Sequence, residues 1–492
     1  MNICLIYPVV KEDMGNWPSL GLAYIAAVLE QEGHFVKIID RNVLSRKKQN
    51  VNGITSDIIK KIKPEIVGIT ATTPIISDAM YSTDLVKSSC PNTKVILGGH
   101  HPTILFNDVL KNENVDIIVL GEGEISMCGI AKGKELKDIP GIAYKEGKKI
   151  FFNGVRNPIF DIDTLPLPAW HLLDMEYYID CSKNYNPVIR GVNLRATHIF
   201  TARGCPYKCA FCAGSVIFGN KVRFHSIDYI IRGIEYLIDN YNIQGIYFAE
   251  DMFLSQKERV KTLCNEFIRR KINKKIVWCA QCRSDSVDKE LLSMMKNAGC
   301  IQVEYGFESG SQRILNFMNK KTSVEQNIWA ADLTKEVGLR FLADIIVGFP
   351  GETEEDFVQT IKFIKKIKPT EIGFNVFTPL PGTKAYNDLI NQKIISTPNW
   401  SDFYVASRKL NFTTMSNCTF FDLYDNFMET FVNPNRVKNY YIYNISHYPL
   451  TTLNNLMQRT KKDPLGTIKK IWFHSSKCIM RKIKGNKIIK EN

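Results

Sequence analysis

The sequence predicts an α/β protein in which a doubly wound parallel sheet is followed by a partial barrel of six βα units. Three observations support this fold class. Short apolar runs alternate with helical patterns over the first 130 residues, the same alternation resumes from about residue 196 to 385, and small or polar loops follow the predicted strands in both regions. Buried parallel strands read as short apolar runs, and the helices between them return the chain to the same end of the sheet.

The first region contains five apolar runs that predict buried strands. They are Ile3–Tyr7, Phe35–Ile39, Ile66–Thr70, Val95–Leu97 and Asp116–Leu120. A first helix is expected to be capped by Ser19 and to end at Gly33, and further helices are expected over 77–88 and 103–111. Because ligands of such sheets bind at the carboxyl ends of the strands, we expect a binding site at that edge.

The second region repeats the pattern six times. Strands are predicted over 197–201, 245–249, 276–282, 301–307, 342–347 and 372–377, and helices over 226–239, 256–270, 288–297, 323–336 and 354–367. Residues 141–153 predict a hairpin that turns at Glu146–Gly147, and a Pro-rich linker follows it. We therefore divide the chain into an α/β domain (1–140), a hairpin and linker (141–190), a partial barrel (191–395) and a small, mostly helical C-terminal region (396–492).

Composition excludes several classes of protein. The chain has 492 residues, of which 45% are hydrophobic and 23% charged, so it is not disordered, collagen-like or a coiled coil. No apolar run approaches the roughly 18 residues of a membrane span, and the first residues lack a signal-peptide layout. We therefore expect a cytoplasmic protein. In that compartment the 13 cysteines are not expected to form a disulfide framework.

The positive charge is concentrated in a C-terminal tail. Residues 459–492 contain eleven Lys or Arg and two acidic residues, which accounts for +9 of the net charge of +14. The body of the chain therefore offers no nucleic-acid surface on charge alone, and no nucleic-acid partner is expected. A solvated end is the simplest interpretation of the tail. Its apolar residues, Trp472 among them, also fit one face of a basic helix that contacts an anionic membrane surface.

The strongest chemical signal is the segment Arg203-Gly204-Cys205-Pro206-Tyr207-Lys208-Cys209-Ala210-Phe211-Cys212. It follows the first predicted barrel strand and can place three thiolates on three corners of a cubane cluster. Iron–sulfur clusters use thiolate ligands, usually four, so three cysteines leave one iron open. A zinc site is the alternative, but it needs a fourth ligand such as His225.

This CxxxCxxC motif, with an aromatic residue before its last cysteine, resembles the radical S-adenosylmethionine (SAM) superfamily. The resemblance implies a [4Fe-4S] cluster bound by Cys205, Cys209 and Cys212, with SAM chelated at the open iron. It also implies anaerobic cleavage of SAM to a 5′-deoxyadenosyl radical, with electrons from a donor such as a flavodoxin or ferredoxin.

Other segments of the barrel match the same superfamily, and their order around it strengthens the resemblance. Arg283 is suited to a charge-assisted bond with the SAM carboxylate. By resemblance, Phe211 lies near the adenine, Glu250 or Asp251 receives the amino group, and Glu308 and Ser309 lie near the ribose. Gly348 belongs to the later strand-end motif Val347-Gly348-Phe349-Pro350-Gly351-Glu352.

The N-terminal region resembles the cobalamin-binding domain that precedes this barrel in one large subfamily. The cobalamin contacts implied by the resemblance lie in the strand-end loops: Ser19, Leu20, Gly21, Thr70, Thr72, Gly98, Gly99, His100, Glu122 and Gly123. The Asp-x-His-x-x-Gly motif of the methionine-synthase type is absent, so no histidine below cobalt is expected from the first loop. His100 and His101 are more simply interpreted as structural.

Together these resemblances predict a radical SAM enzyme with cobalamin that methylates an unactivated carbon of a small-molecule or lipid-like substrate. Oxidative cyclisation, ring contraction or carbon–carbon coupling without methyl transfer is the first alternative. A tRNA methylthiotransferase is the second, and its extra cluster would need Cys4, Cys90 and Cys128. A non-catalytic sensor is the third. No catalytic acid or base is assigned. Cys279 and Cys282 are predicted to be packing residues, because side chains three apart on a strand face opposite ways.

Overall fold

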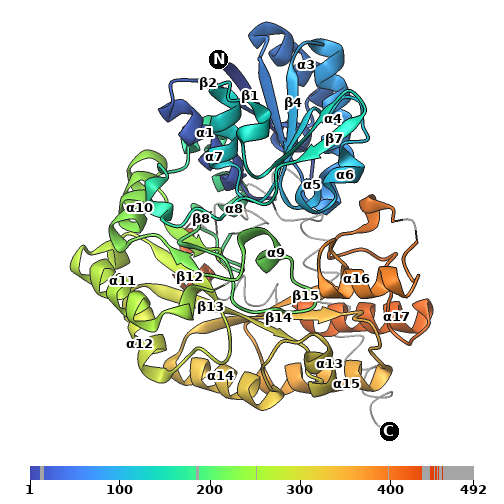
Figure 1. Ribbon diagram of the computed structural model, residues 1–492. Helices are drawn as coiled ribbons and strands as arrows, with labels where there is room; N and C mark the ends of the chain where they lie inside the picture. The colour runs from blue at the N-terminus through green and yellow to red at the C-terminus, as the bar shows by residue number, and fades with distance from the viewer. Residues whose placement is uncertain are drawn as a thin grey trace.

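The computed structural model describes residues 1–10, 16–183, 188–250, 252–396, 398–434, 444–447, 449–450, 453 and 457. An N-terminal α/β domain packs on a larger barrel, and both are seen in Figure 1, the first in blue and the second in green to orange. None of the helices in these ranges is long and apolar enough to cross a membrane. The basic tail at 459–492, with its predicted membrane contact, lies outside the described residues.

The N-terminal sheet has seven strands in the order β2-β1-β3-β4-β5-β6-β7. The first five are parallel, as the sequence predicts, and the predicted hairpin adds β6 and β7 antiparallel to that edge. The strands are β1 (Asn2–Tyr7), β2 (Phe35–Asp40), β3 (Ile66–Thr70), β4 (Lys94–Gly98), β5 (Ile117–Val119), β6 (Ile142–Glu146) and β7 (Lys149–Phe152).

The helices of this domain are α1 (Leu20–Gln31), α2 (Arg41–Arg46), α3 (Val51–Ile62), α4 (Ile76–Ser89), α5 (His100–Ile104), α6 (Phe106–Val109) and α7 (Glu124–Ala131). The helix predicted over 103–111 is wrong in extent, because α5 begins at His100 and a break at Leu105 separates α6. Pro102 fits this earlier start, since the first turn of a helix tolerates proline. Ser19 precedes α1 as predicted, but its side chain makes no capping hydrogen bond.

The second sheet is an open half-barrel of six parallel strands in the order β15-β14-β13-β12-β11-β8. The strands are β8 (Ala196–Ile199), β11 (Gly245–Phe248), β12 (Val277–Cys282), β13 (Cys300–Glu308), β14 (Arg340–Val347) and β15 (Glu371–Val376). All six predicted strands are confirmed. A two-stranded ribbon, β9 (Ala202–Arg203) and β10 (Arg223–Phe224), lies beside the carboxyl end of β8.

The larger helices of the barrel form its outer layer (Figure 1). They are α10 (Ile227–Tyr241), α11 (Lys257–Arg269), α12 (Lys289–Asn297), α14 (Val324–Val337) and α15 (Glu354–Ile367). Their starts follow from capping side chains such as Ser226, Ser323 and Thr353, which accept backbone N–H bonds of the first turn. The remaining helices are α8 (Met175–Lys183), α9 (Gly214–Phe218), α13 (Gln312–Phe317), α16 (Lys384–Asn391), α17 (Asn417–Phe427) and the π-helix Met428–Val432.

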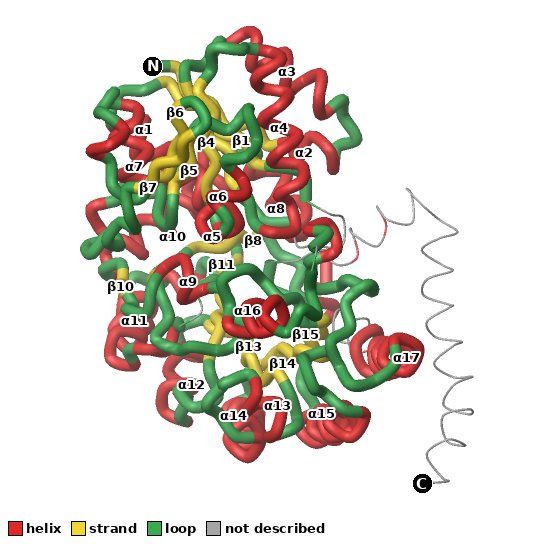
Figure 2. The backbone as a smooth tube through the Cα atoms, turned by 45° about the vertical axis from the view of Figure 1, so that its right-hand side comes forward, coloured by secondary structure: helices red, strands yellow, loops and turns green. Residues whose placement is uncertain are grey.

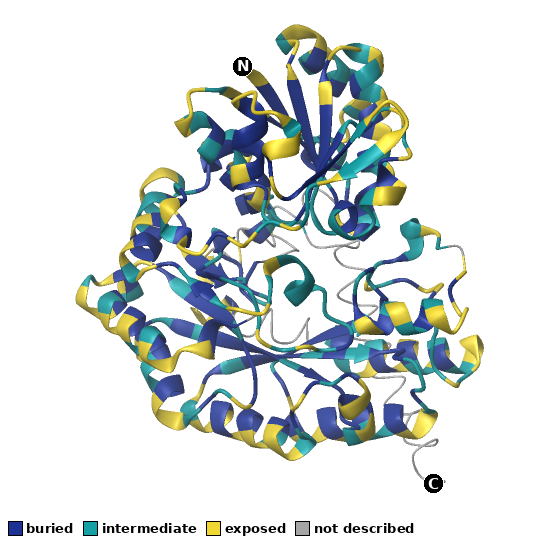
Figure 3. Cartoon of the chain, viewed as in Figure 1, coloured by how far each residue is buried: buried dark blue, intermediate teal, exposed yellow. Residues whose placement is uncertain are grey.

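One hydrophobic core runs through both domains. It contains Leu22 and Ala26 of α1 together with Ile234 of α10, and the linker residue Trp170, only 1% exposed, lies between them. Figure 3 shows this buried interior beneath exposed helix surfaces. Figure 2 shows the two sheets one above the other, with α5 and α9 at the level between them. The linker and this shared core hold the carboxyl ends of the two sheets toward each other.

Candidate functional site

A cavity of about 370 Å³ lies between the two domains. Its upper wall comes from the strand-end loops of the N-terminal sheet, and its lower wall comes from Phe200, Gly204, Ala249 and Glu250 of the barrel. Ile217 and Phe218 of α9, just after the cysteine motif, also line it. The carboxyl ends of both sheets therefore open into one space.

The structure brings eight of the ten predicted cobalamin contacts to this cavity: Gly21, Thr70, Thr72, Gly98, Gly99, His100, Glu122 and Gly123. Ser19 and Leu20 do not line it, and Leu20 is buried at 2% exposure in the core. Ser19 is the N-cap residue of α1, and Leu20, the first residue of the helix, packs in the hydrophobic core.

Two glycines of this wall, Gly99 and Gly123, leave little room for a side chain. Gly99 has φ +95°, and a Cβ there would lie 2.7 Å from the Ala71 carbonyl oxygen. At Gly123, a Cβ would lie 3.0 Å from Cδ1 of Ile25. Side chains are thus absent where the backbone meets the cavity, which lets a large flat group approach closely. This wall fits a corrin.

His100 also faces the cavity, and its Nε2 has no hydrogen-bond partner. Burial lowers the pKa of His100 to about 4, so the imidazole is neutral at physiological pH. His101 is different, because its Nδ1 lies 3.3 Å from the Thr73 hydroxyl and its ring packs edge-on against Trp400. The structure therefore supports a packing role for His101 and leaves Nε2 of His100 buried without a hydrogen-bond partner.

The carboxylate of Glu122, another predicted cobalamin contact, is already paired with side chains of the barrel. Its carboxylate accepts from Arg203 at 3.1 Å and from Arg223 at 2.8 Å, and it also accepts from the backbone N–H of Ile159. Sequence reasoning did not assign either arginine, although Arg203 directly precedes the Gly204-Cys205 pair of the cysteine motif.

The cysteine loop is held from three sides. Gly204 must be glycine, since its φ is +98° and a Cβ would lie 2.2 Å from the Lys221 carbonyl oxygen. The backbone N–H of Ala210 donates to Met318, and its carbonyl accepts from Ala385. Cys205, Cys209 and Cys212 are all half-buried, and none forms a disulfide. The loop is thus built as a rigid and partly accessible cradle for thiolates.

Positive side chains surround Cys209. Burial raises the pKa of its thiol, and the nearby Lys320 and Arg283 oppose that shift. Cations next to a thiolate favour the deprotonated form that binds metal. Lys320 was not identified from the sequence, and it forms a buried 2.6 Å ion pair with Glu308. The chemistry of this donor set fits a negatively charged iron–sulfur cluster.

Arg283 and Phe211 lie in the same group of side chains as Cys209. The guanidinium of Arg283 is 3.6 Å from the ring centroid of Tyr207 and pairs with Asp285 at 2.9 Å. Lys320 Nζ is 5.9 Å from the centroid of the Phe211 ring. The structure therefore places Arg283, Glu308 and Phe211 together around the cysteine loop, although Arg283 and Glu308 each already have an ionic partner.

Glu250 lines the cavity at the end of β11 and is only 5% exposed. Its carboxylate accepts from the backbone N–H of Thr201 at 3.2 Å and from the Thr201 hydroxyl. Burial raises the pKa of Glu250. Asp251, the second candidate for the SAM amino group, lies outside the described residues.

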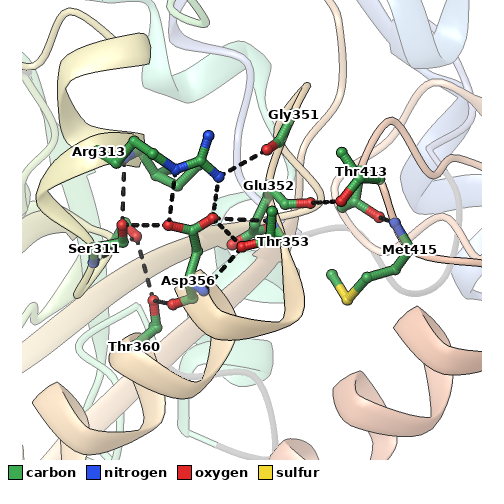
Figure 4. A network of polar contacts seen from close by, with 12 residues as sticks. Ser311, Arg313, Gly351, Glu352, Thr353, Asp356, Thr360, Thr413 and Met415 are labelled. Atoms are coloured by element: carbon green, nitrogen blue, oxygen red, sulfur yellow. Dashed lines mark hydrogen bonds and ion pairs between the residues drawn. The ribbon is translucent and has the colours of Figure 1, made fainter.

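The last two predicted SAM contacts, Ser309 and Gly348, bond residues of a polar network in which Figure 4 labels Glu352, Asp356 and Thr360. Ser309 is fully buried, and its hydroxyl lies 3.2 Å from that of Thr360. Gly348 donates to the Glu352 carboxylate, which stays buried and has its pKa raised by burial to about 8. Asp356 receives bonds from Ser311, Arg313 and Thr353 and so joins these two loops.

No three His, Cys, Asp or Glu side chains among the described residues stand close enough to hold a single metal ion. A cubane cluster does not need such a group, because it binds each thiolate at a different corner. Cys279 and Cys282 are buried in separate core clusters on opposite faces of β12, which confirms the packing role predicted for them.

Comparisons with known proteins match both regions. The family model described as the radical SAM superfamily matches residues 199–364, and the model of the B12 binding domain matches residues 8–131. The chain is 35% identical over 413 residues to an uncharacterized methyltransferase, PH0819, of Pyrococcus horikoshii, an alignment that covers 82% of this chain and 86% of that protein.

Further relatives differ in reaction. The anaerobic magnesium-protoporphyrin IX monomethyl ester cyclase of Rubrivivax gelatinosus is 30% identical over 79% of this chain and 70% of its own length. Among solved structures, the cobalamin-dependent SAM radical enzyme OxsB matches with TM-score 0.71 and 17% identity over 96% of this chain and 75% of its own. The methyltransferase TsrM from Kitasatospora setae matches with TM-score 0.65 and 16% identity over 80% and 75%. At these identities the two structures support the fold.

Proposed function

Because the chain belongs to the radical SAM superfamily and carries its B12 binding domain, we propose that it methylates an unactivated carbon of a small-molecule or lipid-like substrate. It is a cobalamin-dependent radical SAM enzyme, and its cofactors are a [4Fe-4S] cluster, SAM and cobalamin. The observation that carries the proposal is the shared cavity, whose walls come from the cysteine-loop side of the barrel and from the strand ends of the B12 binding domain.

The three cofactors divide the chemistry. When bound, the cluster and SAM supply hydrogen-atom abstraction from carbon, and cobalamin supplies methyl transfer. The protein binds and orients these groups, which is its usual contribution in cofactor enzymes.

We propose that Cys205, Cys209 and Cys212 hold the cluster and that Lys320 and Arg283 offset its negative charge. Arg283 is also the candidate partner of the SAM carboxylate, with its plane fixed by Tyr207. Glu250 is the candidate acceptor for the SAM amino group at the cavity wall, and Glu308 the candidate contact to the ribose. Gly21, Gly98, Gly99 and Gly123 admit the corrin.

Water exclusion is the second task of these residues. The cavity walls are mainly apolar and include Leu22, Ile25, Phe200 and Phe218. A reactive radical formed in such a space is kept from solvent and from side reactions. No described side chain is assigned as an acid or base toward the substrate.

The test is anaerobic reconstitution with iron, sulfide and hydroxocobalamin, followed by reduction in the presence of SAM and extracts that contain candidate substrates. Methyl transfer predicts that S-adenosylhomocysteine and 5′-deoxyadenosine form together, and SAM labelled in its methyl group identifies the acceptor. The Cys209→Ala variant is the control. Formation of 5′-deoxyadenosine without any methylated product contradicts methyl transfer.

The second candidate is oxidative cyclisation, which the identity to magnesium-protoporphyrin cyclases favours. It requires the same cofactors and predicts an oxidised substrate with no methyl label. A methylthiotransferase is favoured only by the 29% identity to a putative methylthiotransferase, MJ0865, of Methanocaldococcus jannaschii. Cys4 and Cys128 lie in separate core clusters, which argues against a second cluster held by Cys4, Cys90 and Cys128.

A reduced flavodoxin or ferredoxin is the proposed electron donor, since the cluster must be reduced before SAM is cleaved. A substrate with lipid character would agree with a membrane contact through the basic tail, and that contact remains a prediction from sequence. Sedimentation of the full chain with anionic vesicles, compared with a chain that ends at residue 458, tests it.

A further inference from the structure

The most extensive charge network between the two domains, within the residues that the structure describes, involves Glu122, Glu124, Arg203 and Arg223, here called the interdomain ion network. Arg203 donates to Glu122 at 3.1 Å and to Glu124 at 2.7 Å. Arg223 donates to both oxygens of Glu122 at 2.8 Å. Glu122 comes from the β5–α7 connection of the N-terminal domain and Glu124 is the first residue of α7. The two arginines come from the β9–β10 ribbon of the barrel.

All four side chains are at least nine-tenths buried, with exposed fractions of 5% for each glutamate, 9% for Arg203 and 7% for Arg223. Arg203 and Arg223 face each other across the antiparallel ribbon. Like charges at such positions repel, and a buried charge without a partner is costly. The ribbon therefore depends on glutamates supplied by the other domain.

The network is directly connected to both halves of the proposed active site. Arg203 is joined through Gly204 to Cys205, and the Lys221 carbonyl lies so close to Gly204 that a Cβ there would be 2.2 Å from it. Glu122 is flanked by Gly121 and Gly123, which line the cavity, and Arg203 lies 5.0 Å from the ring of Tyr24 in the same wall. Glu122 and Arg223 both also bond the linker backbone at Ile159.

We propose that the interdomain ion network is a positioning device that fixes the cysteine loop relative to the cobalamin cavity. Glu122 and Glu124, which also line the cavity, then act as positioning residues. The connection between cysteine loop and cavity follows from the contacts above, whereas its importance for cluster and cobalamin rests on the proposed function.

Two measurements on Glu122→Gln test the proposal. Hydrogen–deuterium exchange of the cofactor-free chain measures local opening. We expect exchange at least about tenfold faster in three segments, residues 119–125, 157–161 and 202–224, because loss of the Glu122 charge leaves Arg223 buried opposite Arg203 without its carboxylate partner. Pulsed dipolar EPR of the reconstituted protein measures the distance from reduced cluster to cob(II)alamin, and we expect that distribution to broaden.

The matched control is Asp78→Asn. It breaks the 2.9 Å ion pair between Asp78 and the buried Arg41. Both residues of that pair belong to the N-terminal domain. We expect it to leave exchange in the three segments and the EPR distance unchanged. The double variant Glu122→Gln/Arg223→Gln removes one charge of each sign, and it is expected to recover part of the exchange protection.

Unchanged exchange and unchanged distance in Glu122→Gln would overturn the proposal. If Glu122→Gln unfolds as a whole, the same two measurements are made on Glu124→Gln. That variant keeps Glu122 and both arginines. A uniform rise in exchange over the whole chain of that milder variant would likewise count against a positioning role. If the wild-type protein binds no cobalamin, the proposed function fails, yet the exchange experiment still decides whether the network orders the cysteine loop.

Discussion

The two sheets of this protein present their carboxyl ends in contrasting ways. The N-terminal sheet ends in glycines and threonines that leave a cavity, whereas the barrel ends in charged side chains that are already paired, such as Glu308 with Lys320 and Arg283 with Asp285. The first edge leaves open space because several of its residues are glycines. The second edge pairs its charged side chains with one another.

We expect the largest effect from removing a proposed cluster ligand on the barrel side of the cavity. Cys209→Ala removes one of three proposed cluster ligands, so we predict iron content near background and no 5′-deoxyadenosine. The cobalamin cavity is formed by other residues, and cobalamin binding should remain within about twofold. Iron assay and the absorbance of bound cobalamin check both parts. Cys90→Ala, a half-buried cysteine far from the motif in sequence, is the control and should retain iron.

The converse experiment breaks the N-terminal side. Gly99→Ala introduces a Cβ within 2.7 Å of the Ala71 carbonyl at a φ of +95°. We predict cobalamin affinity reduced by at least about tenfold, because the wall must shift by a large fraction of a van der Waals radius, while iron content stays unchanged. Equilibrium dialysis with hydroxocobalamin measures the loss.

The control for this variant is Gly133→Ala. Gly133 also has a positive φ, +71°, but a Cβ there meets nothing within 4 Å. It places a Cβ at a positive φ in open space, without the steric conflict at Gly99. Equal losses of affinity in the two variants would mean that the cavity wall is not involved.

A smaller effect is expected from Arg283→Lys. The planar guanidinium stacks on Tyr207 and bonds Asp285 twice, and an ammonium group cannot reproduce that geometry. If Arg283 binds the SAM carboxylate, the SAM concentration at half-maximal 5′-deoxyadenosine formation should rise about tenfold with intact iron content. An unchanged value would assign Arg283 to loop structure only.

The smallest effect that we expect is a change in the pH dependence of the unfolding free energy when Glu352 is substituted. Burial raises the pKa of Glu352 to about 8 in the folded state, above the value of about 4.3 for an unfolded chain. A raised carboxyl pKa means that the folded state binds the proton more tightly than the unfolded chain does. The stability gained from protonated Glu352 is therefore lost as pH rises from about 4 to 8. Glu352→Gln should remove this dependence, so the variant gains stability relative to wild type as pH rises through that range.

Urea denaturation at pH 5.5 and pH 8.5 checks this prediction. The difference in unfolding free energy between variant and wild type should move in favour of the variant at the higher pH, by an amount on the order of 2 kcal/mol. A difference that does not change with pH would show that Glu352 is ionised in the folded protein.

Much of this architecture could be predicted from the sequence because its signals are local. Buried parallel strands read as apolar runs, and three cysteines within eight residues need no tertiary information. The extent of α5 could not be predicted, because the helix begins at His100, with only Gly99 between it and the end of β4 at Gly98, and no local pattern marks the break at Leu105.

The site was predicted less completely than the fold, because several of its residues come together only in the folded chain. Lys320 and Arg223 become part of the site only when distant segments meet, and no local pattern marks them. Glu122 lies in a glycine-rich strand-end loop that is typical of a ligand contact, yet its carboxylate is bound by the facing domain. A side chain in such a loop can therefore serve the interface between domains as well as a cofactor.

The central claim is that one cavity joins SAM-dependent radical chemistry to methyl transfer from cobalamin. The most direct measurement is mass spectrometry of the anaerobic, reconstituted enzyme supplied with methyl-labelled SAM and candidate substrate extracts. We expect 5′-deoxyadenosine, S-adenosylhomocysteine and one labelled product, all of them absent with Cys209→Ala. Formation of 5′-deoxyadenosine with an oxidised, unlabelled product would contradict it.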